Sequence, residues 1–137
     1  MIEVLSHITL ITSDLARMSL IMSQVLDGRE IYSSGEETFS HSREKFFIVG
    51  GQWIAIMEGE GLPSRSYNHI AFKIASTTID TYRARIERLG LDLRESRPRV
   101  EGEGHSLYFY DHDNHLFELH TGTLEERLER YRRGVAP

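Results

Sequence analysis

The chain has 137 residues, of which 39% are hydrophobic, 27% charged and 9% aromatic, a composition typical of one folded domain with a modest core and not of a disordered or fibrous protein. Lys and Arg number 16 against 21 Asp and Glu, so the net charge is −5, which argues against nucleic acid as a partner because binding to phosphates needs a basic surface. Cysteine is absent, which excludes disulfides, thiolate metal sites and a cysteine nucleophile and leaves His, Asp and Glu as metal ligands.

The first part of the chain predicts a strand, a helix and three more strands. Residues 5–12 read as a half-buried strand, and a helix is expected over 14–27, where apolar residues recur at three- and four-residue spacing before Gly28. The period then changes to two, which predicts strands at about 30–34, 45–49 and 53–58. The opening sequence lacks the layout of a signal peptide, and no apolar run is long enough to span a membrane, so we expect a cytoplasmic protein with no membrane partner.

The second part of the chain repeats this order. The segment from Tyr67 to Ile74 lies 62 positions after the first strand and carries a His-Ile pair at the same place. We expect a helix over 78–89, ended by Gly90, and strands at about 91–95, 105–110 and 115–120. A last, charged helix is predicted over about 123–133.

Each half therefore predicts one βαβββ module, the first at about 1–60 and the second at about 66–122. Modules of this size are too small to be stable alone. We expect an α+β fold in which the two modules pair as one domain over residues 1–137, with sheets shared within the chain or across a dimer.

Three residues make up the candidate metal site. His7 and His69 occupy equivalent points of the two modules, so pseudo-symmetry would bring them face to face. Glu118 lies between apolar residues of the last strand, where a buried carboxylate would need a cation or another partner. A symmetric fourth ligand is absent, because a shift of 62 places Ile56 opposite Glu118, unless Glu58 substitutes. The alternative interpretation is that both histidines are structural and Glu118 faces solvent.

Other polar residues are candidates for substrate contacts. Arg97, Arg99 and Arg127 suit a phosphate-like group, although charged runs are usually solvated surface. His120 shares the strand face of Glu118 and His115 lies on the opposite face, and either could be a partner of that ligand. Glu44 has the character of a solvated charge when composition alone is considered.

Five stretches together resemble a known family. They are LSHITL, SREKFF, GGQWIAIMEGE, YNHIAF and GEGHSLYFYDHDNHLFELHTGTLEERL. This combination, which extends over roughly residues 1–133, resembles the vicinal oxygen chelate (glyoxalase and bleomycin resistance) superfamily and, within it, the FosX-type fosfomycin hydrolases.

The resemblance implies a vicinal oxygen chelate fold, in which paired βαβββ modules form cup-shaped mixed sheets around a metal site, and a homodimer whose subunits share the sites. It also implies a divalent metal, usually Mn²⁺, bound by the candidate ligands His7, His69 and Glu118. Glu44 matches the carboxylate that distinguishes the hydrolase branch. The residues that match positions at the substrate, or lie near them, are Thr9, Trp53, Tyr108, Arg99 and Arg127.

The activity implied is a metal-dependent epoxide hydrolysis that inactivates fosfomycin, a small phosphonate epoxide. Glu44 would act as general base on a water molecule, which would attack the carbon that bears phosphorus and produce a vicinal diol. The alternatives are a thiol transferase of the same fold and substrate, or a non-catalytic protein that sequesters a drug. Ring-cleaving dioxygenases also use two His and one carboxylate, but the residues matched to a phosphonate pocket argue against that class.

Overall fold

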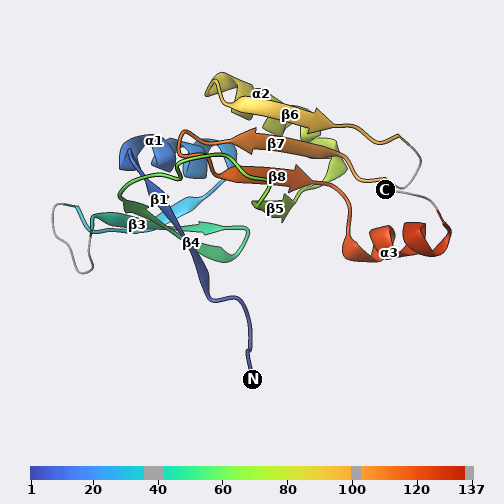
Figure 1. Ribbon diagram of the computed structural model, residues 1–137, viewed down its shortest axis with the longest axis horizontal. Helices are drawn as coiled ribbons and strands as arrows, with labels where there is room; N and C mark the ends of the chain where they lie inside the picture. Colours follow the sequence, from blue (N-terminus) through green and yellow to red (C-terminus); the bar gives the residue numbers. More distant parts are fainter. Residues whose placement is uncertain (36–41, 100–102, 135–137) are drawn as a thin grey trace. The chain divides into compact units, whose positions relative to one another are not determined.

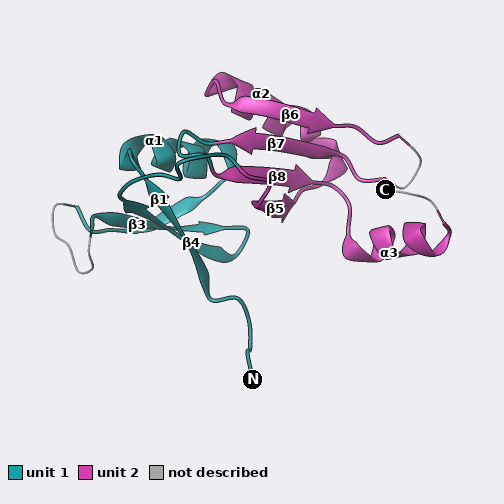
Figure 2. Cartoon of the chain, viewed as in Figure 1, with its two compact units in different colours: residues 1–65, 111–114 teal, residues 66–110, 115–137 magenta. Residues whose placement is uncertain are grey.

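The computed structural model describes residues 1–35, 42–99 and 103–134 (Figure 1). The chain divides into two compact units: unit one comprises residues 1–65 and 111–114, and unit two comprises residues 66–110 and 115–137 (Figure 2). Among the described residues, no helix is both long and apolar enough to cross a membrane. Residues 111–114, which form a turn in the second half of the sequence, belong to unit one and not to unit two.

Unit one is a four-stranded sheet with one helix on it. Its strands lie in the order β1-β4-β3-β2, with β1 parallel to β4 and the other neighbours antiparallel (Figure 1). The helix packs against β4. The elements are β1 (His7–Thr12), α1 (Leu15–Leu20), η1 (Ile21–Val25), β2 (Arg29–Ser33), β3 (Glu44–Val49) and β4 (Gln52–Glu58).

The predicted helix over 14–27 is present but changes geometry on its way. Asp14 caps α1 by accepting a hydrogen bond from the Arg17 amide at 3.0 Å. After Leu20 the helix widens into the π-helical turn η1, closed by a bond from the Leu26 amide to the Ile21 carbonyl at 3.2 Å. Asp27 then adopts a φ of 55°, which ends the helix before Gly28.

Unit two repeats the topology of unit one. Its strands lie in the order β5-β8-β7-β6, and β5 is parallel to β8, while the other pairs are antiparallel. The prediction of two βαβββ modules and a C-terminal helix is therefore confirmed. The elements are β5 (His69–Lys73), η2 (Ser76–Thr78), α2 (Ile79–Arg88), β6 (Asp92–Ser96), β7 (Ser106–Tyr110), β8 (Leu116–His120) and α3 (Leu124–Arg132).

Each sheet buries one face in an apolar core. In unit one the core contains Met18 of α1 and Ile54 and Ile56 of β4, none more than 1% exposed. In unit two, Phe109 of β7 and Phe117 of β8 are both 0% exposed and stack with ring centroids 5.3 Å apart. Since strand side chains alternate between faces, the residues between these lie on the opposite face of each sheet.

The turn between β7 and β8 is anchored in unit one through Asp113, which is 5% exposed. Its Oδ2 accepts a hydrogen bond from the Thr12 hydroxyl at 2.6 Å. Its Oδ1 accepts from the Ser13 amide at 2.9 Å and from the Ser13 hydroxyl at 2.7 Å. The Asp113 carbonyl accepts from the Leu62 amide at 3.1 Å. One carboxylate thus fixes the end of β1, where the chain enters α1.

Replacing Asp113 with Ala is expected to lower the free energy of unfolding by about 2–4 kcal/mol, since a hydrogen bond to a charged group contributes about 1.5–3 kcal/mol and Thr12 is 0% exposed. Urea denaturation at one fixed protein concentration measures the change. Asp80→Ala is the matched control: its side chain is 94% exposed and pairs with Arg83 at the surface, so its loss should be below about 1 kcal/mol. Equal losses in the two variants would contradict the role assigned to Asp113.

Candidate metal centre

The sheet face of unit one opposite Ile54 and Ile56 carries the four site residues predicted from this half of the chain. The register pairs His7 with Trp53 across β1 and β4 and Glu44 with Met57 across β3 and β4. Directly paired residues lie on the same face of a sheet, and so do alternate residues of one strand. Thr9, two residues after His7, and Met57, four after Trp53, therefore share one face with Glu44.

The His7 imidazole is oriented by its neighbours in unit one. It stacks on the Trp53 indole with ring centroids 4.1 Å apart and planes 28° apart, and its Nδ1 lies 3.0 Å from the Ser6 hydroxyl. The Trp53 indole also contacts Phe46 edge-on at 5.1 Å. Within the described residues, the Trp53 Nε1 is a buried donor without a hydrogen-bond partner. This donor and the outward-facing His7 belong to one aromatic surface.

Glu44 has a fixed backbone and an uncommitted side chain. Its amide donates to the Ser34 hydroxyl and its carbonyl accepts from the Ser34 amide, both at 3.0 Å. Within the part of the chain that the structure describes, the Glu44 carboxylate forms no hydrogen bond or ion pair and is half-buried. A carboxylate of this kind can accept a proton from a water molecule.

The pseudo-symmetric counterpart of Glu118 is Ala55 and not Ile56. Glu118 pairs with Ala71, the second residue after His69, and Ala55 pairs with Thr9, the second residue after His7. The offset between the modules is therefore 63 in the last strand, one more than at the histidines. Because of this one-residue difference in offset, Ile56 faces the core and not the side of the sheet that corresponds to Glu118. Glu58 lies two residues after Ile56 in β4, so it is on the same side of the sheet as the core residues, and it forms an ion pair with Arg43.

Unit two brings His69 and Glu118 together. The Nε2 of His69 lies 3.0 Å from Oε1 of Glu118, whose residue is 6% exposed. Nδ1 of His69 lies 2.7 Å from the Tyr67 carbonyl, which can only accept, so Nδ1 carries a proton. A neutral His69 thus presents the Nε2 lone pair to a carboxylate oxygen, an arrangement that needs a proton or a cation between the two atoms. This donor set fits a divalent metal.

The predicted three ligands are divided between the units, with His7 in unit one and His69 and Glu118 in unit two. Among the residues the structure describes, no group of three or more His, Asp and Glu side chains is gathered in metal-binding geometry. Each unit by itself therefore supplies only part of the predicted site.

Tyr108 lies on the same face as Glu118, with which it is paired across β7 and β8. Burial raises the pKa of Tyr108, and its hydrogen bond with Tyr67 raises that pKa further. The two hydroxyl oxygens lie 3.1 Å apart. Tyr108 is therefore a neutral phenol that can donate to an anion. Sequence reasoning missed Tyr67, which lies two residues before His69 and just outside β5; its closeness to that histidine in the sequence was a usable signal.

The three candidate arginines differ in the ion pairs that they form. Arg97 Nε lies 3.3 Å from Glu95, and Arg99 Nε lies 3.5 Å from Glu103. Arg127 borders a hollow of about 220 Å³ with His120, Gly122, Thr123 and Leu124. Within the described residues, its guanidinium forms no ion pair. Of the three, Arg127 is the arginine most available to a phosphonate.

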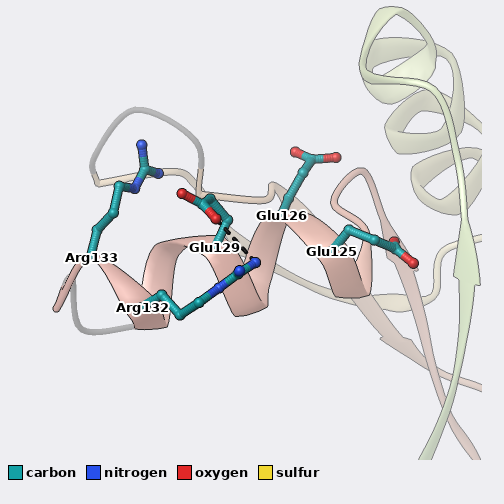
Figure 3. A pocket seen from close by; sticks show the side chains of 5 residues that line it. All are labelled: Glu125, Glu126, Glu129, Arg132 and Arg133. Carbon is teal, nitrogen blue, oxygen red and sulfur yellow. Dashed lines mark ion pairs between the residues drawn. The ribbon is translucent and has the colours of Figure 1, made fainter.

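A second hollow, of about 400 Å³, lies along α3 and is bordered by charged side chains alone (Figure 3). Arg132 and Glu129 form an ion pair there at 3.0 Å. The remaining side chains at this hollow are Glu125, Glu126 and Arg133. None belongs to the strand faces that carry the predicted ligands, and we assign no site to it.

Glu95 organises the charges at the outer edge of unit two. Arg83 donates two hydrogen bonds to it, from Nε to Oε1 at 2.8 Å and from Nη2 to Oε2 at 2.7 Å. These bonds lower the pKa of Glu95 from 4.5 to about 2, although burial opposes the shift and His105 assists it. His105 Nε2 lies 2.6 Å from the same carboxylate, so this histidine, which the sequence analysis does not include among the ligands, has a structural partner.

Comparison with known proteins identifies close relatives. The family model described as the glyoxalase/bleomycin resistance protein/dioxygenase superfamily matches residues 4–119. The fosfomycin resistance protein FosX of Mesorhizobium japonicum is 62% identical over 98% of this chain and 97% of its own length. The metallothiol transferase FosB of Staphylococcus saprophyticus is 31% identical over 96% of this chain and 85% of its own.

Solved structures show the same similarity. A mutant of FosX from Listeria monocytogenes, crystallised with Mn(II) and 1S,2S-dihydroxypropylphosphonic acid, superposes with a TM-score of 0.85 at 55% identity. The match covers 96% of this chain and 99% of that one. The expected fold class is therefore confirmed.

Glu95 predicts a pH dependence of stability. Because its pKa in the folded chain, about 2, lies below the ordinary 4.5, its stabilising contribution is complete above about pH 4.5 and is lost as the pH falls towards 2. Glu95→Gln should therefore flatten the loss of stability over this range, measured by urea denaturation at stepped pH. Glu87→Gln, at an exposed position of α2, should keep the wild-type profile. Identical acid profiles for wild type and Glu95→Gln would refute the assignment.

Proposed function

We propose, from the premise that this chain belongs to the glyoxalase/bleomycin resistance protein/dioxygenase superfamily and to its fosfomycin resistance proteins, that it is a manganese-dependent hydrolase that opens the epoxide of fosfomycin with water. The similar Listeria protein binds Mn(II) and a diol phosphonate, which is the class of product that this reaction forms. The observation on this chain that carries the proposal is the buried Glu118 carboxylate, 3.0 Å from His69 Nε2.

We assign His7, His69 and Glu118 as the metal ligands. Two imidazoles and one carboxylate are ligands that Mn²⁺ accepts, and they leave coordination positions for substrate. When bound, the metal supplies Lewis-acid stabilisation to the phosphonate and epoxide oxygens. The stack of His7 on Trp53 and the bond from His69 Nδ1 to the Tyr67 carbonyl orient both rings, as is usual for metal-binding histidines.

The substrate is held by cationic and neutral donors. Arg127 carries no competing ion pair within the described residues, and the Tyr108 phenol is neutral, so both donate to the phosphonate oxygens. Thr9 and Trp53, which share the face of His7, line the oxirane. Arg99 is a weaker ligand in this arrangement, since it would have to share its guanidinium with Glu103.

Glu44 is the general base. It takes a proton from water while the water oxygen forms a bond to the carbon that bears phosphorus. The bond between that carbon and the epoxide oxygen breaks, and this oxygen takes up a proton from solvent to complete the vicinal diol, while Glu44 releases its proton to solvent. The uncommitted carboxylate of Glu44, on the same sheet face as Thr9, supports this role.

The alternative activity is addition of a thiol to the same substrate. A hydrolase is favoured because the FosX relative shares 62% identity with this chain and the metallothiol transferase 31%. A non-catalytic drug-binding protein is disfavoured because such a protein has no need of a buried acid paired with an imidazole.

We also propose that the chain works as one domain, in the cytoplasm, and as a homodimer whose subunits share the sites. Because the ligands are divided between two units of the chain, a site can be completed by a second subunit, and exchange of inactive chains distinguishes this arrangement from a site formed within one chain. The cytoplasmic location stays a prediction from the sequence.

Phosphorus NMR of fosfomycin incubated with the manganese-loaded protein tests the activity. Wild type should form the diol without any thiol, and Glu44→Gln, which keeps the shape but not the basicity, should hydrolyse about 10²–10⁴-fold more slowly. Metal and substrate binding should survive in the variant.

The matched control is Glu58→Gln. Glu58 lies on the neighbouring strand but pairs with Arg43, so this variant should retain the wild-type rate. Turnover only in the presence of a thiol would establish the transferase instead, and binding without any product would establish a drug-sequestering protein. Hydrolysis by Glu44→Gln at the wild-type rate would show that another group is the base.

Mixing inactive chains tests the shared sites. If His7 of one subunit completes the site of its partner, a His7→Ala chain exchanged with a Glu118→Ala chain should recover about one quarter of wild-type activity, because half of the dimers are mixed and each has one intact site. The control pairs His69→Ala with Glu118→Ala, which lie in the same unit, and should recover none. If chain exchange is demonstrated but activity does not return, the sites are not shared in this way.

A further inference from the structure

A buried chain of hydrogen bonds lies behind the Glu118 carboxylate in unit two. The Ser106 hydroxyl lies 2.6 Å from Oε2 of Glu118 and 2.7 Å from Nδ1 of His120. Ser106 is 4% exposed and Glu118 is 6% exposed. Ser106 and His120 are direct partners in the register of β7 and β8, so the backbone itself brings the two side chains together on one face.

The direction of these hydrogen bonds follows from the chemistry of the groups. An ionised carboxylate only accepts, so the single hydroxyl hydrogen of Ser106 is donated to Glu118. The hydrogen between Ser106 and His120 must then come from His120 Nδ1. The chain therefore runs from the Nδ1–H of His120 to the Ser106 oxygen and from the Ser106 hydroxyl to Glu118 Oε2.

Two glycines hold the His120 ring in place. A Cβ added at Gly104 would lie 2.5 Å from His120 Nε2, and one added at Gly122 would lie 2.7 Å from the same atom. Both distances are too short for real contacts, so a side chain at either position would displace the imidazole from its present place. The imidazole is thus confined beside the backbone at the ends of both strands, and its Nδ1 keeps its direction towards Ser106.

The two oxygens of Glu118 consequently have different surroundings. Oε2 receives the Ser106 hydrogen bond, while Oε1 faces His69 Nε2. We propose that Ser106 and His120 are positioning residues that hold Oε2 and so present Oε1 to the divalent cation. This inference rests on the proposed function, because it concerns the same metal site. Hydrogen-bonded partners of this kind orient a ligand before the metal binds, and their loss typically weakens metal affinity about 10–100-fold.

Manganese titration of the metal-free full-length chain, followed by electron paramagnetic resonance, tests the inference. Ser106→Ala should bind Mn²⁺ about 10–100-fold more weakly than wild type, and the spectrum of the bound ion should change because the carboxylate is free to rotate. Ser106→Thr keeps the hydroxyl and should restore binding. Ser19→Ala is the matched control, because the Ser19 hydroxyl donates to the Leu15 carbonyl within α1, and this variant should match wild type in both affinity and spectrum.

Variants of His120 provide a second measurement that does not depend on the folding of Ser106→Ala. His120→Asn places an amide donor where Nδ1 lies and should bind Mn²⁺ more tightly than His120→Gln, whose donor is displaced. Wild-type affinity in both Ser106→Ala and His120→Gln would overturn the positioning role while leaving the proposed function intact. A wild-type chain that does not bind Mn²⁺ would overturn both.

Discussion

A carboxylate buried in the middle of a strand must be compensated by hydrogen bonds, a proton or a cation, and Glu118 places this demand on unit two. The Ser106 hydroxyl donates to Oε2 of Glu118, and His69 Nε2 faces Oε1. Because the desolvation of a lone carboxylate is costly, its neighbours have to be arranged around it. The Tyr67 carbonyl fixes the tautomer of His69, and Gly104 and Gly122 leave room for the His120 ring beside Ser106.

The alternation of side chains across each sheet explains how the same fold makes both a core and a site. Phe117 and Leu119 face the core, while Glu118 between them faces the other way. In unit one, Ile54 and Ile56 enter the core, and Trp53 shares the opposite face with His7. Because successive side chains of a strand point to opposite faces, one face can form the core while the other carries candidate ligands. A repeated βαβββ module can therefore carry ligands at equivalent points.

The distribution of ion pairs decides which cations are available to a phosphonate in a chain of net charge −5. Glu95 and Glu103 engage Arg97 and Arg99. Arg127 has no such partner within the described residues and lies beside His120 at a hollow. A local field from one uncommitted guanidinium, together with a bound cation, can attract a dianion despite the acidic surface, since both act at short range.

The sequence by itself determined the βαβββ repeat, the order of its helices and strands, and the equivalent positions of His7 and His69 at the starts of the two modules, because hydrophobic periodicity and repeated motifs are local properties. Tertiary structure alone decided that Ala55, and not Ile56, corresponds to Glu118, since one extra residue in a loop reverses every later side chain of a strand. It also decided that Asp113 anchors the end of β1 and that Ser106 meets Glu118. Such contacts depend on register between segments far apart in the chain, which no local pattern specifies.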